Sequence, residues 1–79
     1  MVAPQLTLPV PLVVVDAAAS TVLRARPGRR AEILAREVEA FRVELLRQGH
    51  RPADAADFSR SFGATVRHRL REAGGRAHQ

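Results

Sequence analysis

Two apolar stripes with helical spacing run through the second half of the chain. The first contains Leu34, Val38, Phe41 and Leu45, at i, i+4, i+7 and i+11. The second contains Ala55, Phe58, Phe62, Val66, Leu70 and Ala73. Gln48-Gly49-His50 interrupts the pattern, and glycine is common just beyond a helix C-terminus. Because this connection is short, the spacing predicts a mainly α fold with an antiparallel helical hairpin over about residues 30–48 and 53–73.

Finer features of the hairpin follow from its polar residues and glycines. Acids stand three or four residues from arginines, which predicts the exposed ion pairs Glu32–Arg36, Glu39–Arg42 and Glu44–Arg47. The glycines Gly74-Gly75 are predicted to end the second helix. The hairpin then occupies residues 31–75, and residues 76–79 form a frayed tail.

Small size and the lack of cysteine limit what can stabilise this hairpin. The chain has 79 residues and no cysteine, so we expect one domain without disulfides. Chains of this length bury only about 60% of the surface that they expose when unfolded. We therefore expect stability to come from helix packing or from contact with another protein chain.

Upstream of the hairpin, apolar residues alternate with a period of two. Pro9 and Pro11 lie in this segment, where they disfavour a helix. Both prolines remove N–H donors from the same strand edge, so only the opposite edge can pair. The pattern predicts an extended β-arm over residues 1–15 that adds a strand to a sheet of another chain, either a second copy or a larger assembly. The predicted partner-binding residues are Leu6, Leu8, Val10, Leu12 and Val14.

A basic junction over residues 16–30 connects the arm to the hairpin. Asp16 is a suitable N-cap for a short helix through Ala17–Ala25, and Pro27-Gly28 ends that helix. The junction is either a solvated hinge or a contact for phosphate or for an acidic protein surface. Its four arginines are Arg24, Arg26, Arg29 and Arg30.

The stretch from Gly49 to Leu70 resembles the helix-turn-helix segment of transposase-type and homeodomain-like proteins. The matching residues are Gly49-His50, Ala53-Asp54, Ala56, Thr65-Val66 and Leu70. The resemblance implies a turn at Ser59-Arg60-Ser61, followed by a recognition helix that contacts DNA.

A single continuous helix is the competing interpretation of the same stretch. It places Phe58 and Phe62 on one buried stripe, and burying a Phe side chain contributes about 1.5–3 kcal/mol. Keeping Gly63 inside a helix costs about 1 kcal/mol. This comparison favours the continuous helix.

Three arginines share one stripe of the second long helix. Arg60, Arg67 and Arg71 span about 16 Å along a helix that rises 1.5 Å per residue. The stripe either follows a phosphate backbone or is a solvated face on which Asp57 pairs with Arg60. Arg69 lies near the apolar stripe, where it either extends its charged end to water or contacts a partner. All 13 basic residues are arginine and the formal net charge is +5, which permits nucleic-acid binding without requiring it.

The sequence contains no arrangement typical of an enzyme or a cofactor site. His50, His68 and His78 lack metal-ligand spacing, and no cysteine assists them. The serines lack the context of an activated nucleophile, and the glycines form no phosphate-binding loop. We therefore expect a non-enzymatic interaction or assembly subunit without cofactor or small-molecule substrate. The alternative is a small DNA-binding regulator of the helix-turn-helix type.

The location of the protein is predicted from its N-terminal segment. The apolar run there is too short to cross a bilayer as a helix, and it lacks the basic start of a signal peptide. We expect a cytoplasmic protein without membrane contact.

Overall fold

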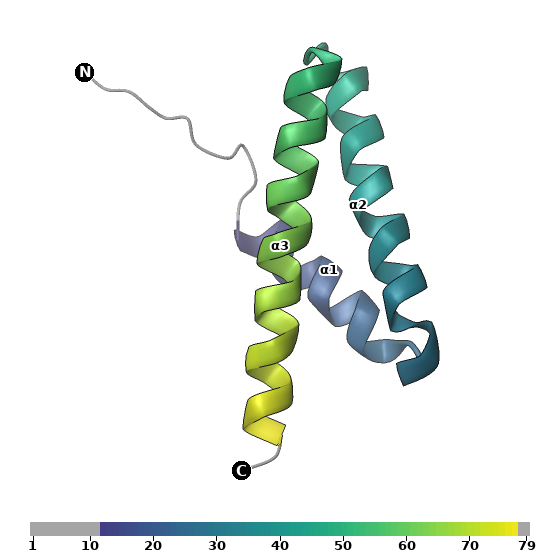
Figure 1. The fold of residues 1–79 in the computed structure, drawn as a ribbon, viewed down its shortest axis with the longest axis vertical. Coiled ribbons are helices and arrows are strands. Elements are labelled where there is room, and N and C mark those ends of the chain that lie inside the picture. Colours follow the sequence, from purple (N-terminus) through teal and green to yellow (C-terminus); the bar gives the residue numbers. More distant parts are fainter. Residues whose placement is uncertain (1–11, 78–79) are drawn as a thin grey trace, which may run out of the picture.

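Three α-helices and one short 3₁₀ turn make up the part of the chain that the structure describes. A computed structural model describes residues 12–77, with side chains for residues 12–74. The elements are α1 (Leu12–Arg24), the 3₁₀ turn η1 (Pro27–Arg29), α2 (Arg30–Arg47) and α3 (Pro52–Ala77). α2 and α3 form an antiparallel hairpin, and α1 crosses one side of it (Figure 1). The predicted mainly α fold is therefore confirmed as a three-helix, all-α fold.

The connection between α2 and α3 is the glycine-centred turn that the sequence predicts. Gly49 has a φ of 98°, in the left-handed region that glycine adopts without a steric penalty. Its N–H donates to the carbonyl of Leu46 at 3.0 Å, and the N–H of His50 donates to the carbonyl of Leu45 at 3.1 Å. These two bonds form a Schellman motif, which satisfies carbonyls that the end of α2 would otherwise leave unpaired.

We expect Gly49→Ala to lower the free energy of unfolding by about 1 kcal/mol, because left-handed backbone is strained for a residue with a Cβ. No atom lies within 4 Å of a Cβ built at Gly49, so backbone strain alone causes the loss. Urea denaturation followed by circular dichroism measures the change. Gly28→Ala is the matched control, because its surroundings are equally open and its φ is not positive. An equal loss in both variants would contradict this prediction.

Helix α1 begins at Leu12, so the predicted extended arm is wrong for residues 12–15. The core-facing residues Val15, Ala18, Ala19 and Val22 recur at i, i+3, i+4 and i+7, and all four are buried. Only a helix places them on one face, and their burial outweighs the β-propensity of the valine run. Within residues 12–77 there is no strand, and the predicted arm residues Leu6, Leu8 and Val10 lie outside the described residues.

The predicted helix over Ala17–Ala25 exists, but its bounds are different. Proline restricts the backbone conformation of its own position and of the preceding residue, but not of the residue after it. Pro11 is therefore compatible with a helix that begins at Leu12. Asp16 is therefore not an N-cap. It lies inside α1, where its carboxylate forms an ion pair with Arg69 of α3. The distance from Arg69 Nη1 to Asp16 Oδ1 is 3.3 Å.

Helix α3 is continuous from Pro52 to Ala77. This agrees with the prediction that the energy gained by burying Phe62 exceeds the cost of keeping Gly63 inside a helix. The turn at Ser59-Arg60-Ser61 that the helix-turn-helix resemblance implies is absent. Ser59 is instead buried within the helix, and its hydroxyl donates to the carbonyl of Ala56 at 3.0 Å. The predicted helix end at Gly74-Gly75 is also wrong, because a cost of about 1 kcal/mol per glycine weakens a helix without ending it.

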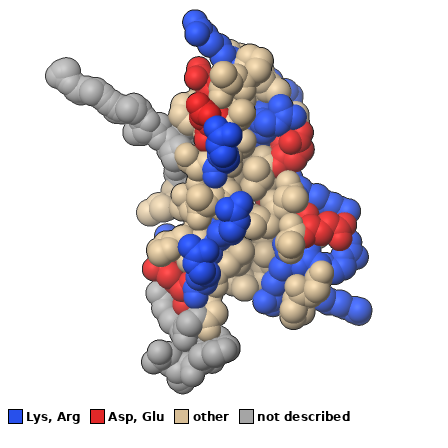
Figure 2. All heavy atoms as spheres, in the orientation of Figure 1, with Lys and Arg blue, Asp and Glu red and all other residues tan. Residues whose placement is uncertain are grey.

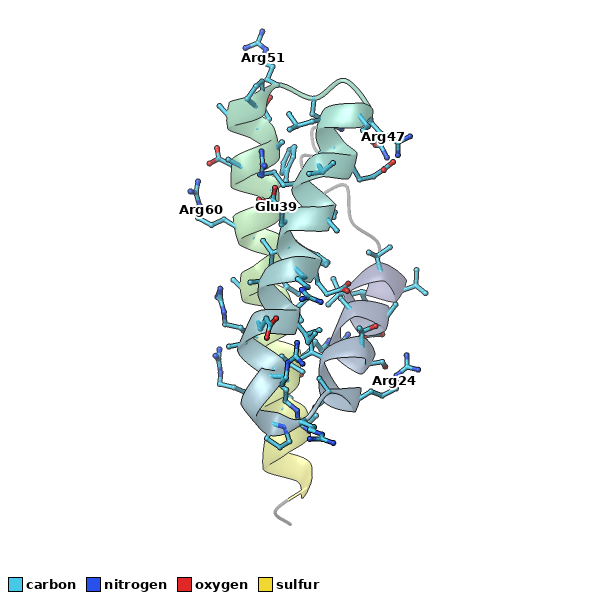
Figure 3. All side chains as sticks on the ribbon, turned by 90° about the vertical axis from the view of Figure 1, so that its right-hand side faces the viewer. Arg24, Glu39, Arg47, Arg51 and Arg60 are labelled. Atoms are coloured by element: carbon cyan, nitrogen blue, oxygen red, sulfur yellow. The ribbon has the colours of Figure 1, made fainter. Side chains whose placement is uncertain are left out.

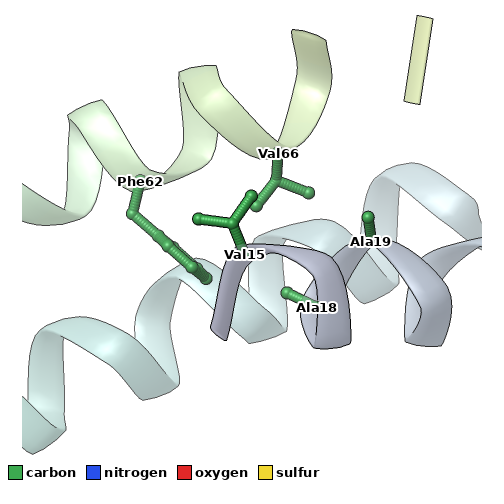
Figure 4. Packing of buried hydrophobic residues seen from close by; sticks show 5 residues of the cluster. All are labelled: Val15, Ala18, Ala19, Phe62 and Val66. Carbon is green, nitrogen blue, oxygen red and sulfur yellow. The ribbon is translucent and has the colours of Figure 1, made fainter. Parts of the chain in front are cut away.

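The core lies where α1 crosses the hairpin. Two alanines of α1 allow it to approach closely, and Figure 4 shows the resulting cluster of Val15, Ala18, Ala19, Phe62 and Val66. The rings of Phe41 and Phe62 stack with their centroids 4.4 Å apart. The half-buried side chains that pack against this cluster are Leu34, Val38, Phe41 and Leu70. Because these large residues are only partly covered, the fold leaves open apolar surface beside its core.

Gly63 lies at the contact between α2 and α3. It is buried, and a Cβ built at this position would lie 3.0 Å from Cγ2 of Val38 on α2. The glycine that costs helix propensity therefore has a packing role, because it lets the two helices approach at Val38.

Candidate functional site

The junction arginines divide into two that support the fold and two that extend into solvent. Arg29 forms a bidentate pair with Glu32, with both N–O distances at 3.1 Å. The guanidinium of Arg30 donates to the backbone carbonyls of Ala25 and Leu23, at 3.2 and 3.1 Å. It thereby satisfies carbonyls at the C-terminus of α1. Arg24, which points away from α1 in Figure 3, and Arg26 are exposed and have no hydrogen-bond or ion-pair partner among the described residues.

Three of the four arginines of α2 are paired with acids on the same helix. The three predicted pairs are confirmed, with Arg36–Glu32 at 3.1 Å, Arg47–Glu44 at 2.8 Å and the Arg42–Glu39 pair bonded through two nitrogens. The hydrogen bond from Arg42 lowers the pKa of Glu39, and the same bond raises the pKa of Arg42. Hydrogen bonding from Gln48 and the charge of Arg47 lower the pKa of Glu44. The exposed face of α2 is therefore neutralised within the helix.

Glu37 is an exception on α2. Its side chain is half-buried, and it forms no ion pair with any other described residue. No arginine stands three or four residues from it in the sequence, so its own helix supplies no partner.

Helix α3 carries the predicted row of arginines on a side that faces solvent. Arg60, Arg67 and Arg71 are all exposed, and Figure 2 shows basic side chains along the length of α3. Arg60 pairs with Asp57 as predicted, while Arg67 and Arg71 have no acidic partner among the described residues. Arg69 lies on the other side of the helix, half-buried and paired with Asp16 of α1. The row therefore differs from α2 in keeping unneutralised charge.

The N-terminal turn of α1 exposes three consecutive aliphatic side chains. Leu12, Val13 and Val14 are 63%, 69% and 39% exposed. Val14 also lines an open groove between α1 and α2, with a volume of about 270 Å³. The other lining residues are Ala17, Ala18, Thr21, Glu37, Ala40, Phe41 and Phe62. Leu12 and Val14 are thus accessible as the sequence predicts, but they are presented by a helix instead of a strand.

A second open groove lies on the opposite flank of α2, against α3. Its volume is about 470 Å³, and its apolar floor is formed by Ala31, Leu34, Ala35 and Val38. Glu39 and Arg67 lie at its edges. Glu39 is engaged by Arg42, so Arg67 is the charged group at this edge that remains available.

Features of two other functional classes are absent from the described residues. Within residues 12–77, no helix is both long enough and apolar enough to cross a membrane. In the same part of the chain, no three His, Asp or Glu side chains are grouped so that they could bind a metal ion.

The chain has no detectable similarity to known proteins. No protein-family model, curated protein or solved structure matches the chain. The roles of the α1 and α3 surfaces therefore have to be inferred from their own shape and charge.

Because a strand was predicted for residues 12–15, part of the exposed surface of α1 was not predicted. Val13, Ala17 and Glu37 were not among the predicted site residues. Once Val15, Ala18, Ala19 and Val22 are recognised as one helical face, the opposite face follows from the same spacing. The residues of that opposite face are Val13, Ala17, Ser20 and Arg24.

Proposed function

We propose that the chain is a non-enzymatic assembly subunit that pairs with a second copy of itself through the outer face of α1. The observation that carries this proposal is the exposure of Leu12, Val13 and Val14 in a single helical turn. Fully burying a valine or leucine side chain contributes about 1.5–3 kcal/mol. Val13 lies on the outer face, with Leu12 and Val14 on either side of it, so covering this turn in both copies would favour association.

The shape of the α1 surface favours close packing of two helices. Val13 begins its outer stripe and Arg24 ends it, and only the small residues Ala17 and Ser20 lie between them. Short side chains in the middle of a stripe let two helix backbones approach closely. In an antiparallel pair, Ala17 of each copy then faces Ser20 of the other, and Val13 of each faces Arg24 of the other.

The charges on this surface are complementary between two copies of the chain. Glu37 lines the same groove as Val14 and has no ion-pair partner among the described residues. Arg24 has none either, and the antiparallel arrangement brings it to the Val13–Val14 turn of the second copy. Each two-fold pair would therefore gain two Arg24–Glu37 contacts, since a symmetric interface repeats every contact. This self-complementarity favours a second copy over an unrelated protein.

We expect a weak dimer, with a dissociation constant on the order of micromolar, because association itself costs about 4–15 kcal/mol. Sedimentation equilibrium over a range of concentrations measures this constant. We expect Glu37→Arg and Arg24→Glu each to weaken association about tenfold, in the range seen when one member of an interfacial charge pair is altered. Combining the two substitutions should restore association, because the pair is re-formed with its charges exchanged.

Arg36→Glu is the matched control for Arg24→Glu. It changes the net charge by the same amount on an exposed face of α2, so we expect the dissociation constant to stay at the wild-type value. A chain that remains monomeric at about 1000 times the expected constant would rule out self-association. An exchange of charges that fails to restore pairing would rule out the proposed arrangement.

A further inference from the structure

We infer that the exposed face of α3 binds the phosphate backbone of duplex nucleic acid. The face consists of Arg60, Arg67 and Arg71, separated by seven and four residues along one helix. At 1.5 Å per residue, these intervals correspond to about 10 and 6 Å along the helix axis. A rigid helix therefore holds three guanidinium groups in a line, and a guanidinium group can bind phosphate oxygens in a bidentate manner.

The surroundings of the row leave it accessible. The small residues Ala53, Ala64 and Gly74 are exposed beside the arginines and leave room for a ligand, while Asp57, also exposed, pairs with Arg60. The row runs along α3 beside the contact with α2, where Arg67 lies at the edge of the groove formed by Leu34 and Val38, and no residue of α1 lines that groove. It is therefore separate from the outer face of α1, and the inference does not rest on self-association.

The charges of Arg67 and Arg71 are not used by the fold. Arg67 and Arg71 form no hydrogen bond or ion pair with another described residue. They stand four residues apart, a spacing at which like charges repel by about 0.2–0.5 kcal/mol on a helix. A bound phosphate chain would remove this repulsion. On α2, in contrast, Glu32, Glu39 and Glu44 already pair with three of the four arginines.

The composition of the face favours nucleic acid over an acidic protein. Protein interfaces depend on buried apolar anchors, and residues 52–74 of α3 expose no large apolar side chain. The face also lacks asparagine, glutamine and aromatic residues, which commonly hydrogen-bond to base edges or stack on bases. We therefore expect binding to duplex backbone that is largely independent of base sequence.

The test is the salt dependence of binding to a duplex DNA of about 20 base pairs, measured by fluorescence anisotropy. Three phosphate contacts predict a slope of about −2.7 for the logarithm of the association constant against the logarithm of salt concentration. The affinity of the intact chain should then fall about 40-fold between 50 and 200 mM salt. The double variant Arg67→Gln/Arg71→Gln should have a slope of about −0.9, because one contact remains.

The control is Arg36→Gln/Arg47→Gln, which removes the same formal charge from exposed positions on α2. It should keep the wild-type slope, since these arginines lie outside the row. Equal losses in the two double variants would mean that only net charge attracts DNA, and would overturn the inference. So would an absence of binding at about 50 mM salt, or equal affinity for poly-glutamate with the same dependence on Arg67 and Arg71. Circular dichroism of each variant verifies that it remains helical.

Discussion

Replacing Phe62 with alanine is expected to remove a large fraction of the free energy of unfolding of this chain. The Phe62 side chain is 2% exposed, packs with Val15 and Val66, and stacks on Phe41. Deleting a buried Phe side chain costs about 3–5 kcal/mol, because the surrounding residues collapse only partly into the cavity. Stabilities of about 0.05–0.15 kcal/mol per residue give a chain of this size about 4–12 kcal/mol in total.

Urea denaturation followed by far-ultraviolet circular dichroism measures this loss. Phe58→Ala is the matched control, because Phe58 lies on the same helix but is only half-buried and contacts the edge of His50. We expect it to cost less than half as much as Phe62→Ala. A Phe62→Ala variant with the midpoint of the wild type, or a larger loss for Phe58→Ala, would show that the core is not centred on Phe62.

The burial of Phe62 also explains why the hairpin could be predicted from sequence. Its apolar stripes are long, each repeats with helical spacing, and Gly49 gives a local signal for the end of α2. In a helix-turn-helix, Phe62 would open the recognition helix and lose these contacts. The stripe on α3 therefore decides between one helix and two without reference to any distant residue.

Helix α1 could not be predicted in the same way, because its valine run fits two periodicities. Leu12 and Val14 continue the alternation that begins at Leu6, while Val15 begins the helical series that ends at Val22. Short apolar runs of this kind are ambiguous between strand and helix. The contact of Val15 with Phe62 and Val66 favours the helix over the strand. These two residues lie far along the chain and become neighbours of Val15 only in the folded state.

The candidate sites also differ in whether they could be predicted from local sequence. The row of Arg60, Arg67 and Arg71 follows from the period of one helix, and its exposure was predicted. The role of Arg30 in capping α1 was not, because the end of α1 has to be known before its unpaired carbonyls can be located. Interactions within one helix and the pairing of the two hairpin helices could thus be predicted from the sequence, but the contacts that α1 makes with the hairpin could not.

Gly63→Leu is expected to destabilise the chain by about 3 kcal/mol, at the upper end of the usual cost of overpacking. A Cβ at this position would lie 3.0 Å from Cγ2 of Val38, and leucine adds three further carbons beyond it. The end of the Arg67 side chain is also near, at 3.7 Å, but it is flexible and can move aside. Val38 is half-buried between the helices, so the strain has to be relieved by moving α2 away from α3. Thermal unfolding measures the resulting loss of stability.

Gly74→Leu is the matched control, because Gly74 lies in the same helix, is exposed, and has no atom within 4 Å of a built Cβ. It should raise stability by up to about 1 kcal/mol, the difference in helix propensity between glycine and leucine. The smaller change Gly63→Ala then identifies the contact responsible. In a Val38→Ala background it should cost less than in the wild type, because the methyl group that it strikes is gone, and contacting residues give non-additive effects of this kind. Strictly additive losses would mean that Gly63 is required for a reason other than the approach of Val38. In that case Val38→Ala would leave the cost of Gly63→Ala unchanged.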